Sequence, residues 1–301
     1  MNTPTTAADA AIAAKPTDRE IDTWGLTHAG LVRSQNQDHF VIASLHRRMQ
    51  VHQTSVPELA AHAVADERLA YLAMVADGVG SSEHGDEASR VALATAMEYV
   101  SESMKCYYAT GATGDDFTAA LQEAAVTCHA RVRERAEAAG TRKMATTLTL
   151  YLGVWPWAYL LQVGDSRYYL FRDGELTQVT RDQTMAQDLV DQGVFTRVDS
   201  QRSPLAHVLS SAIGGQQAAP VVTRIAADRR NVHLLCSDGL TKHVPDERIR
   251  ERLATMTSAR QVCEALLQDA LDGGGSDNVT LIVGRILPPG HATDATASPC
   301  G

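Results

Sequence analysis

The sequence predicts an α+β domain in which antiparallel β-sheets are covered by helices on the outside. Short apolar runs that end at Gly, Asp or Ser indicate strands. Longer segments rich in Ala, Glu and Arg, with apolar residues three and four positions apart, indicate helices. The helices come in pairs between runs of strands without a regular strand–helix–strand alternation, which favours antiparallel sheets.

The predicted strands are apolar or β-branched. Leu69–Ala76 is nearly all apolar and stops at Asp77-Gly78, whereas Thr146–Val154 alternates between apolar and polar residues. The other strands are expected at Trp157–Val163, Tyr168–Arg172, Val232–Cys236 and Val279–Ile286.

Two long helices are predicted at Glu87–Lys105 and Asp116–Ala139. Asp115 or Asp116 is the expected N-cap of the second helix, and Gly140 is its expected C′ residue. Shorter helices are expected at Gln183–Gln192, Asp246–Ala254 and Ala259–Ala270.

The composition predicts one soluble domain with a sizeable core. The chain has 301 residues, of which 44% are hydrophobic and 21% charged. We expect the domain at residues 20–288, between disordered tails at 1–19 and 289–301 that consist largely of small and polar residues. The formal net charge of −9 gives no reason to expect nucleic acid or an anionic membrane as a partner.

The cysteines and the hydropathy predict a cytoplasmic protein. The five cysteines are odd in number and none is spaced C-x-x-C, which argues against a disulfide framework or a zinc knuckle. No apolar run approaches the ~20 residues that cross a membrane. The N-terminal stretch also lacks the basic start and apolar centre of a secretory signal.

Aspartates recur where predicted strands begin or end. Asp77, Asp165 and Asp238 lie in Gly- or Ser-containing turns, Asp277 precedes the last strand, and Asp38 adds a fifth position. Short carboxylates at strand ends are held rigidly, and neighbouring glycines let a backbone carbonyl approach an ion. Mg²⁺ and Mn²⁺ prefer such oxygen ligands. Each dipeptide alone is also an ordinary turn, so it is the recurrence that predicts an acidic metal site.

The ordered set of motifs resembles the bacterial branch of the PPM (PP2C) family of metal-dependent protein phosphatases. The resemblance covers essentially residues 22–287 and is carried by several short stretches. They are Gly30-Leu-Val-Arg33-Ser-Gln-Asn36-Gln37-Asp38, Val75-Ala-Asp77-Gly78-Val79-Gly80, Ala145-Thr146-Thr147-Leu148, Val163-Gly164-Asp165-Ser166-Arg167, Leu235-Cys236-Ser237-Asp238-Gly239-Leu240 and Gly275-Ser276-Asp277-Asn278-Val279-Thr280.

The resemblance implies a four-layer sandwich, with two antiparallel β-sheets face to face and antiparallel helix pairs outside. It also implies a site for two Mn²⁺ or Mg²⁺ ions at one end of the sandwich. By position in the motifs, Asp77 resembles the family's bridging ligand, the Gly78 carbonyl a ligand of one ion, and Asp238 and Asp277 ligands of the other. Asp165 resembles the ligand of a third ion.

Two further residues have implied roles. Asp38 resembles the acidic residue that holds metal-bound waters, and Arg33 the arginine that binds the substrate phosphate. A guanidinium fork matches two phosphate oxygens, although a lone arginine is more commonly a solvated surface residue.

The implied reaction is hydrolysis of phosphoserine and phosphothreonine on proteins, by a hydroxide that bridges two ions and without a covalent intermediate. The reaction implies phosphoprotein substrates and a counteracting Ser/Thr kinase acting in trans. The family analogy suggests a monomer.

The chain departs from the family pattern at three positions. Val79 stands where many members have a histidine that is proposed as the general acid, and Ser81 replaces the usual second glycine. Lys242 stands where many members have another aspartate of the third metal site, so that site is in question. We expect Lys242 to be a solvated loop residue, with binding of substrate phosphate as the alternative.

Two segments are longer or more variable than the motifs around them. Residues 46–68 form a long connection in which His46, His52 and His62 lack metal-ligand spacing. Residues 182–215 match the family's variable flap beside the active site.

Two other functions compete with a protein phosphatase. One is a catalytically weak, phosphatase-like binding or sensor module, and the other is a hydrolase of small phosphoesters. Retention of Asp77, Asp238 and Asp277 argues against a pure binding module, because clustered charge is costly.

Overall fold

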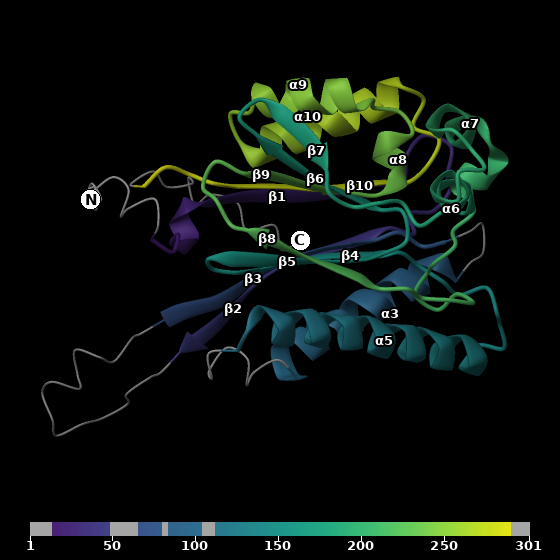
Figure 1. The fold of residues 1–301 in the computed structure, drawn as a ribbon, viewed down its shortest axis with the longest axis horizontal. Helices are drawn as coiled ribbons and strands as arrows, with labels where there is room; N and C mark the ends of the chain where they lie inside the picture. Colours follow the sequence, from purple (N-terminus) through teal and green to yellow (C-terminus); the bar gives the residue numbers. More distant parts are fainter. Residues whose placement is uncertain (1–13, 49–65, 80–83, 104–111, 290–301) are drawn as a thin grey trace, which may run out of the picture.

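Two five-stranded antiparallel β-sheets pack face to face in this computed structural model, which describes residues 14–48, 66–79, 84–103 and 112–289. The strand order is β1-β10-β9-β6-β7 in one sheet and β2-β3-β4-β5-β8 in the other. Helices cover both outer faces, so that Figure 1 shows four layers from top to bottom. This architecture confirms the predicted fold class.

In the first sheet, an early strand of the chain pairs with the last one. Its strands are β1 (Ile21–His28), β10 (Val279–Ile286), β9 (Val232–Cys236), β6 (Arg167–Arg172) and β7 (Glu175–Gln178). The second sheet consists of β2 (His39–Arg48), β3 (Asp66–Ala76), β4 (Leu148–Val154), β5 (Trp157–Val163) and β8 (Val221–Ala226). Every paired strand in both sheets is antiparallel.

Each sheet has its own helices (Figure 1). The helices α3 (Gly85–Glu98) and α5 (Gly114–Ala138) lie on the second sheet, and η2 (Tyr99–Ser103) continues α3. The helices α9 (Asp246–Ala254) and α10 (Ala259–Asp272) lie on the first sheet. The short elements are η1 (Asp18–Glu20), α6 (Met185–Asp191), α7 (Arg197–Arg202), η3 (Pro204–His207) and α8 (Asp238–Thr241).

Three apolar clusters hold the layers together. One packs the second sheet against α3 and α5 around Met74 and Leu121, and another packs the first sheet against α9 and α10 around Leu234 and Leu266. The third lies between the sheets and includes Val75. Alternate residues of β3 therefore face the outer helices and the intersheet core, as the period of two along a strand requires.

Most predicted elements are confirmed within one or two residues, and the differences have local causes. The N-cap of α5 is Thr113, not Asp115 or Asp116. The Thr113 hydroxyl accepts a hydrogen bond from the backbone N–H of Asp116, whose carboxylate accepts the backbone N–H of Thr113. Asp116 thus occupies the N3 position of a capping box. Gly140 has a φ of 67°, as its predicted C′ position requires.

The sequence did not indicate β1, β2, β7, β8 or α7. Residues 14–19, which we expected in a disordered tail, contact β3. The ammonium group of Lys15 donates to the carbonyl of Arg68, whose guanidinium in turn donates to the carbonyl of Pro16. None of the helices in the described ranges is long and apolar enough to cross a membrane.

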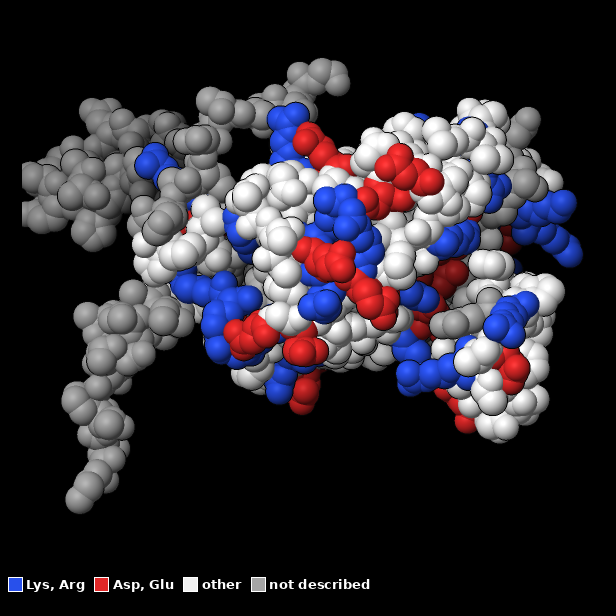
Figure 2. Space-filling model, turned by 90° about the horizontal axis from the view of Figure 1, so that it is seen from above, with Lys and Arg blue, Asp and Glu red and all other residues white. Residues whose placement is uncertain are grey.

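Acidic and basic side chains alternate over the face seen in Figure 2. Acidic atoms also lie in a hollow on the right of that view, with lysine and arginine atoms at its edge. No broad surface of one sign appears among the described residues on this face.

Candidate functional site

Five aspartates meet at one end of the sandwich because each lies where a strand begins or stops. Asp77 follows β3 and Asp38 precedes β2, in the second sheet. Asp238 follows β9, Asp277 precedes β10, and Asp165 lies in the turn between β5 and β6. The structure thus brings together every acidic residue that the sequence singled out.

A cavity of ≈ 490 Å³ lies among these residues and is lined mainly by polar side chains. Asp77, Asp165, Asp238 and Asp277 line it, whereas Asp38 lies beneath the surface and is only 1% exposed. The rest of the lining is Arg33, Ser34, Gln35, Gln37, Gly78, Val79, Thr147, His207, Leu209, Lys242 and Asn278.

The buried carboxyl of Asp38 has an unused oxygen. Burial raises the pKa of Asp38 to about 6, although hydrogen bonds from Ser237 and Thr280 oppose the shift. The Oδ2 atom has no hydrogen-bond partner among the described residues. A buried acceptor left without a partner is costly, and a cation or its bound water would satisfy this oxygen.

The carboxylates also repel one another. Burial raises the pKa of Asp77 well above its ordinary value, and the charges of Asp38, Asp238, Asp165 and Asp277 raise it further. Burial, followed by the charge of Asp238, raises the pKa of Asp165 to about 8. Such a cluster holds its charge at neutral pH only with compensating cations.

The turn that carries Asp77 is fixed by hydrogen bonds. The backbone N–H of Asp77 donates to Thr147 Oγ1 over 3.0 Å, and the Thr147 and Ser166 hydroxyls are 2.8 Å apart. A Cβ at Gly78 would lie 2.5 Å from the carbonyl oxygen of Gly85, so only glycine fits there.

Lys242 is not the solvated loop residue that we expected. Its Nζ lies 2.6 Å from Asp238 Oδ2 and 2.7 Å from Asp277 Oδ2, so the ammonium bridges the two carboxylates. Burial opposes the charge of Lys242, but Asp238 and Asp277 together raise its pKa above the ordinary value. The short helix α8 explains this arrangement, because positions 238 and 242 are one turn apart.

Arg33 is also paired, although it lines the cavity. Its Nε lies 2.8 Å from Asp277 Oδ1, and its Nη2 donates to Asp277 Oδ2 over 3.0 Å. Asp277 therefore meets two cationic side chains, and their hydrogen bonds outweigh burial and lower its pKa. The Arg33 side chain is 43% exposed, so it can be reached from solvent.

The donor set fits hard divalent cations. Carboxylate oxygens suit Mn²⁺ and Mg²⁺, which commonly take one or two carboxylates each and complete their coordination with water. Among the described residues, no three His, Cys, Asp or Glu side chains already form a metal-ligand group. The Lys242 ammonium lies between the carboxylates of Asp238 and Asp277.

Other residues that line the cavity were not singled out from the sequence. His207, at the end of η3, and Leu209 come from the predicted flap. No local motif marks His207, because a histidine after a proline-containing turn is an ordinary surface residue. Val79 lines the cavity and has no proton to donate. Ser81, His52 and His62 lie outside the described residues.

The chain is similar to known phosphatases over most of its length. The sequence pattern of the family described as Protein phosphatase 2C matches residues 50–273. The Serine/threonine protein phosphatase PstP of Mycobacterium tuberculosis is 35% identical over 219 residues, which are 72% of this chain and 41% of that protein. The Serine/threonine phosphatase stp of Listeria monocytogenes is 27% identical over 70% of this chain and 83% of that protein.

Solved structures agree with these relatives. The crystal structure of the Mycobacterium tuberculosis phosphatase PstP/Ppp superposes with a TM-score of 0.71 at 30% identity, covering 89% of this chain and 99% of that one. A PstP catalytic domain in complex with two manganese ions gives a TM-score of 0.68 at 31% identity, covering 89% and 98% of the two chains. This chain spans less than half of the full-length PstP that it matches.

Proposed function

Because this chain belongs to the protein phosphatase 2C family, we propose that it hydrolyses phosphoserine and phosphothreonine on proteins with the help of Mn²⁺ or Mg²⁺. The observation that carries the proposal is the cluster of five mutually repelling aspartates around one polar cavity. The relative that contains two manganese ions supports two ions here.

The residues that would hold the ions are Asp77, the Gly78 carbonyl, Asp238 and Asp277, with Asp165 as a further ligand. When bound, the ions supply positive charge and activate water for attack on phosphorus. Asp38 would hold water in place through its unpartnered Oδ2. A third ion at Asp165 would compete with the charge of Lys242, which acts on Asp165.

Arg33 would bind the phosphate of the substrate. Its planar guanidinium can donate two parallel hydrogen bonds to phosphate oxygens. In the structure this fork contacts Asp277, so binding of phosphate requires Arg33 to exchange part of that contact. Cys236, two residues before Asp238, is not suited to be a nucleophile, because burial raises its pKa to about 12 and its side chain lies in the apolar cluster under α9 and α10.

The substrate and partners follow from the reaction. We propose phosphorylated proteins as substrates, a Ser/Thr kinase in trans as the opposing enzyme, a monomeric state, and the cytoplasm as the compartment. Neither a nucleic acid nor a membrane is among the proposed partners.

A phosphatase-like binding module is the alternative. The bridge from Lys242 to Asp238 and Asp277 favours it, because this ammonium supplies one positive charge without any metal ion. The remaining repulsion at Asp77 favours the enzyme, because the Lys242 ammonium and the Arg33 guanidinium together do not compensate five carboxylates.

Hydrolysis of para-nitrophenyl phosphate tests the proposal. We expect turnover that rises with Mn²⁺ and disappears with EDTA, and loss of turnover in Asp77→Ala and Asp238→Ala. A phosphothreonine peptide, compared with nucleotides and sugar phosphates, then distinguishes a protein phosphatase from a small-molecule hydrolase. A folded protein without Mn²⁺-dependent turnover would support the binding module.

A further inference from the structure

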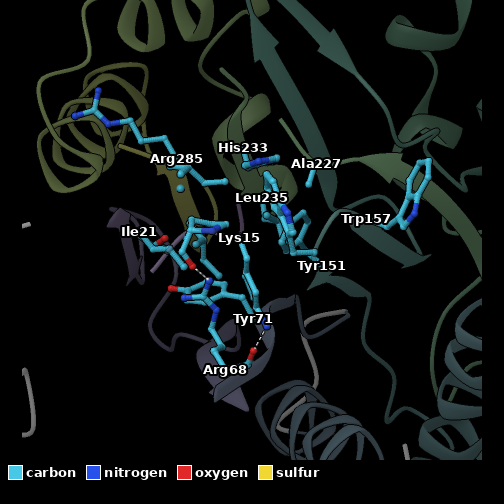
Figure 3. Close-up of a pocket in the computed structure, with 18 of the residues that line it drawn as sticks. Lys15, Ile21, Arg68, Tyr71, Tyr151, Trp157, Ala227, His233, Leu235 and Arg285 are labelled. Atoms are coloured by element: carbon cyan, nitrogen blue, oxygen red, sulfur yellow. Dashed lines mark hydrogen bonds between the residues drawn. The ribbon is translucent and has the colours of Figure 1, made fainter. Parts of the chain in front are cut away.

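A second cavity, of ≈ 80 Å³, lies between the two sheets (Figure 3). It is lined by Tyr71 and Tyr151 of the second sheet and by His233, Leu235 and Ile282 of the first. The lining also includes Arg68 and Arg285, which lie at the ends of β3 and β10 that are remote from the aspartates. The cavity is therefore at the opposite end of the sandwich from the candidate active site.

His233 offers an unpaired hydrogen-bond donor to this cavity. Burial lowers the pKa of His233 to about 4, so the imidazole is neutral at physiological pH. Its Nδ1 lies 2.5 Å from the hydroxyl of Tyr168, which is fully buried and has no other hydrogen-bond partner among the described residues. The Tyr168 hydroxyl thus donates to Nδ1, and the ring hydrogen lies on Nε2. Nε2 has no partner within the described ranges.

Tyr151 contributes a second unpaired polar group. Its ring centroid is 5.1 Å from that of His233, and both side chains lie in the cavity lining (Figure 3). Burial raises the pKa of Tyr151, so the phenol keeps its proton. Its hydroxyl has no hydrogen-bond partner among the residues that the structure describes. These two polar groups have no protein partner in the described part of the chain and line an otherwise largely apolar cavity that opens to solvent, so a ligand or water can reach them.

The charges around the cavity limit the kind of ligand. Arg68 is paired with Asp18, and Arg285 lies 2.9 Å from Asp22. Lys15 donates to a backbone carbonyl and lies 4.0 Å from Glu67 Oε1. Each cation in the described part of the cavity lining thus has an acidic neighbour, and a buried carboxylate would lack compensation.

We propose that this cavity binds a neutral aromatic molecule of one ring that carries a hydrogen-bond-accepting oxygen, such as an aryl ketone. The ring packs against Tyr71, Leu235 and Ile282, and the oxygen accepts hydrogen bonds from His233 Nε2 and the Tyr151 hydroxyl. An apolar cavity of ~150 Å³ encloses benzene completely. This smaller cavity opens to solvent, so it holds one ring with part of the ligand in the opening.

Three ligands of similar size test the proposal by NMR titration of the full chain. Acetophenone has the ring and the acceptor, ethylbenzene lacks the acceptor, and benzoate carries a charge. We expect acetophenone to shift the signals of the cavity residues and to bind about thirtyfold more tightly than ethylbenzene, as two net hydrogen bonds imply. Benzoate should bind more weakly than either.

Two substitutions locate the site. His233→Phe should reduce the advantage of acetophenone over ethylbenzene to about fivefold, because the Tyr151 hydroxyl still donates one hydrogen bond. Ala73→Leu should abolish binding of both ligands by filling the cavity. If Ala73→Leu does not fold, Gly153→Ala replaces it, because a Cβ there would lie 3.2 Å from the Tyr151 ring. The proposal is overturned if acetophenone leaves the cavity signals unchanged at several millimolar, or if His233→Phe binds acetophenone as the unaltered protein does. Neither result depends on the phosphatase activity.

Discussion

Burial shifts the pKa values of ionisable groups in opposite directions at the two ends of the intersheet space. At the end where β3 stops, burial raises the pKa values of Asp38 and Asp165 to about 6 and 8, and the carboxylates repel one another. At the other end, burial lowers the pKa of His233 to about 4 and leaves a neutral, largely apolar cavity.

The difference indicates which kind of ligand would compensate the buried groups at each end. Desolvation disfavours charge at both ends. The acidic end carries more negative charge than its protein cations compensate, so bound metal ions would stabilise it. At the neutral end the described cations are paired, whereas His233 Nε2 and the Tyr151 hydroxyl have no protein partner among the described residues, so an uncharged polar ligand fits there.

The largest expected effect comes from removing the central charge of the acidic end. Asp77→Asn should lower Mn²⁺-dependent turnover of para-nitrophenyl phosphate by about a thousandfold or more, because a neutral amide is a poor metal ligand. Without metal, the same variant should melt at a higher temperature than the unaltered protein, because the repulsion is reduced. The control is Asp272→Asn on α10, which should change neither property. Unchanged turnover in Asp77→Asn would contradict the assignment.

The neutral end should appear in the pH dependence of stability. The pKa of His233 is about 4 in the folded state, below the model value of 6.5. The unfolded chain therefore binds more protons between these pH values, and stability falls as the pH falls through this window. The difference between the unaltered protein and His233→Phe should change by about 3 kcal/mol across it.

Urea unfolding at a series of pH values measures this difference. Asp38, whose folded pKa is raised, acts with the opposite sign, because its stabilising contribution is lost as the pH rises through about 6. Comparison with His207→Gln, which changes an exposed histidine, isolates the contribution of His233. A pH profile that is the same in His233→Phe would show that the imidazole titrates normally.

Lys242 places a cation within the acidic end. Its removal should increase the difference in charge between the two ends of the intersheet space. Lys242→Met frees Asp238 and Asp277 from the ammonium and should tighten Mn²⁺ binding about tenfold, or by about 1.4 kcal/mol. Isothermal titration calorimetry measures the affinity, with Lys143→Met at an exposed position as the control. Equal or weaker Mn²⁺ binding in Lys242→Met would mean that the ammonium does not compete with the ions.

The smallest expected effect concerns His207, which lines the acidic cavity, whereas position 79 is a valine. His207→Gln should lower kcat about tenfold with a phosphothreonine peptide and only slightly with para-nitrophenyl phosphate. An alkoxide leaving group needs a proton more than nitrophenolate does. An equal loss with both substrates would indicate a role in binding and not in proton donation.

The sequence predicted the acidic end well because its residues are tied to strand boundaries. Asp77 and Asp238 follow apolar runs directly, and a strand end fixes the position of the next side chain. The long helix α5 and the strands β5, β9 and β10 were predictable for a different reason, because each has a strong apolar pattern.

The missed features depend on contacts between segments far apart in the sequence. β1 contains Gly25 and several polar residues, and it is a strand because it pairs with β10. The role of Lys242 depends on the short helix α8 and on Asp277, thirty-five residues further on. The cavity at His233 gives no sequence signal at all, because it results from the way that β3, β4, β9 and β10 pack.

The most direct test of the account is the location of Mn²⁺ by anomalous diffraction from crystals grown with Mn²⁺. We expect two manganese peaks in the cavity of ≈ 490 Å³, next to Asp77, Asp238 and Asp277, with the Lys242 ammonium displaced from the two carboxylates. Crystals that contain Mn²⁺ but show no peak at these aspartates, with Lys242 still bridging Asp238 and Asp277, would contradict the central claim that this end of the sandwich is a metal-dependent catalytic site.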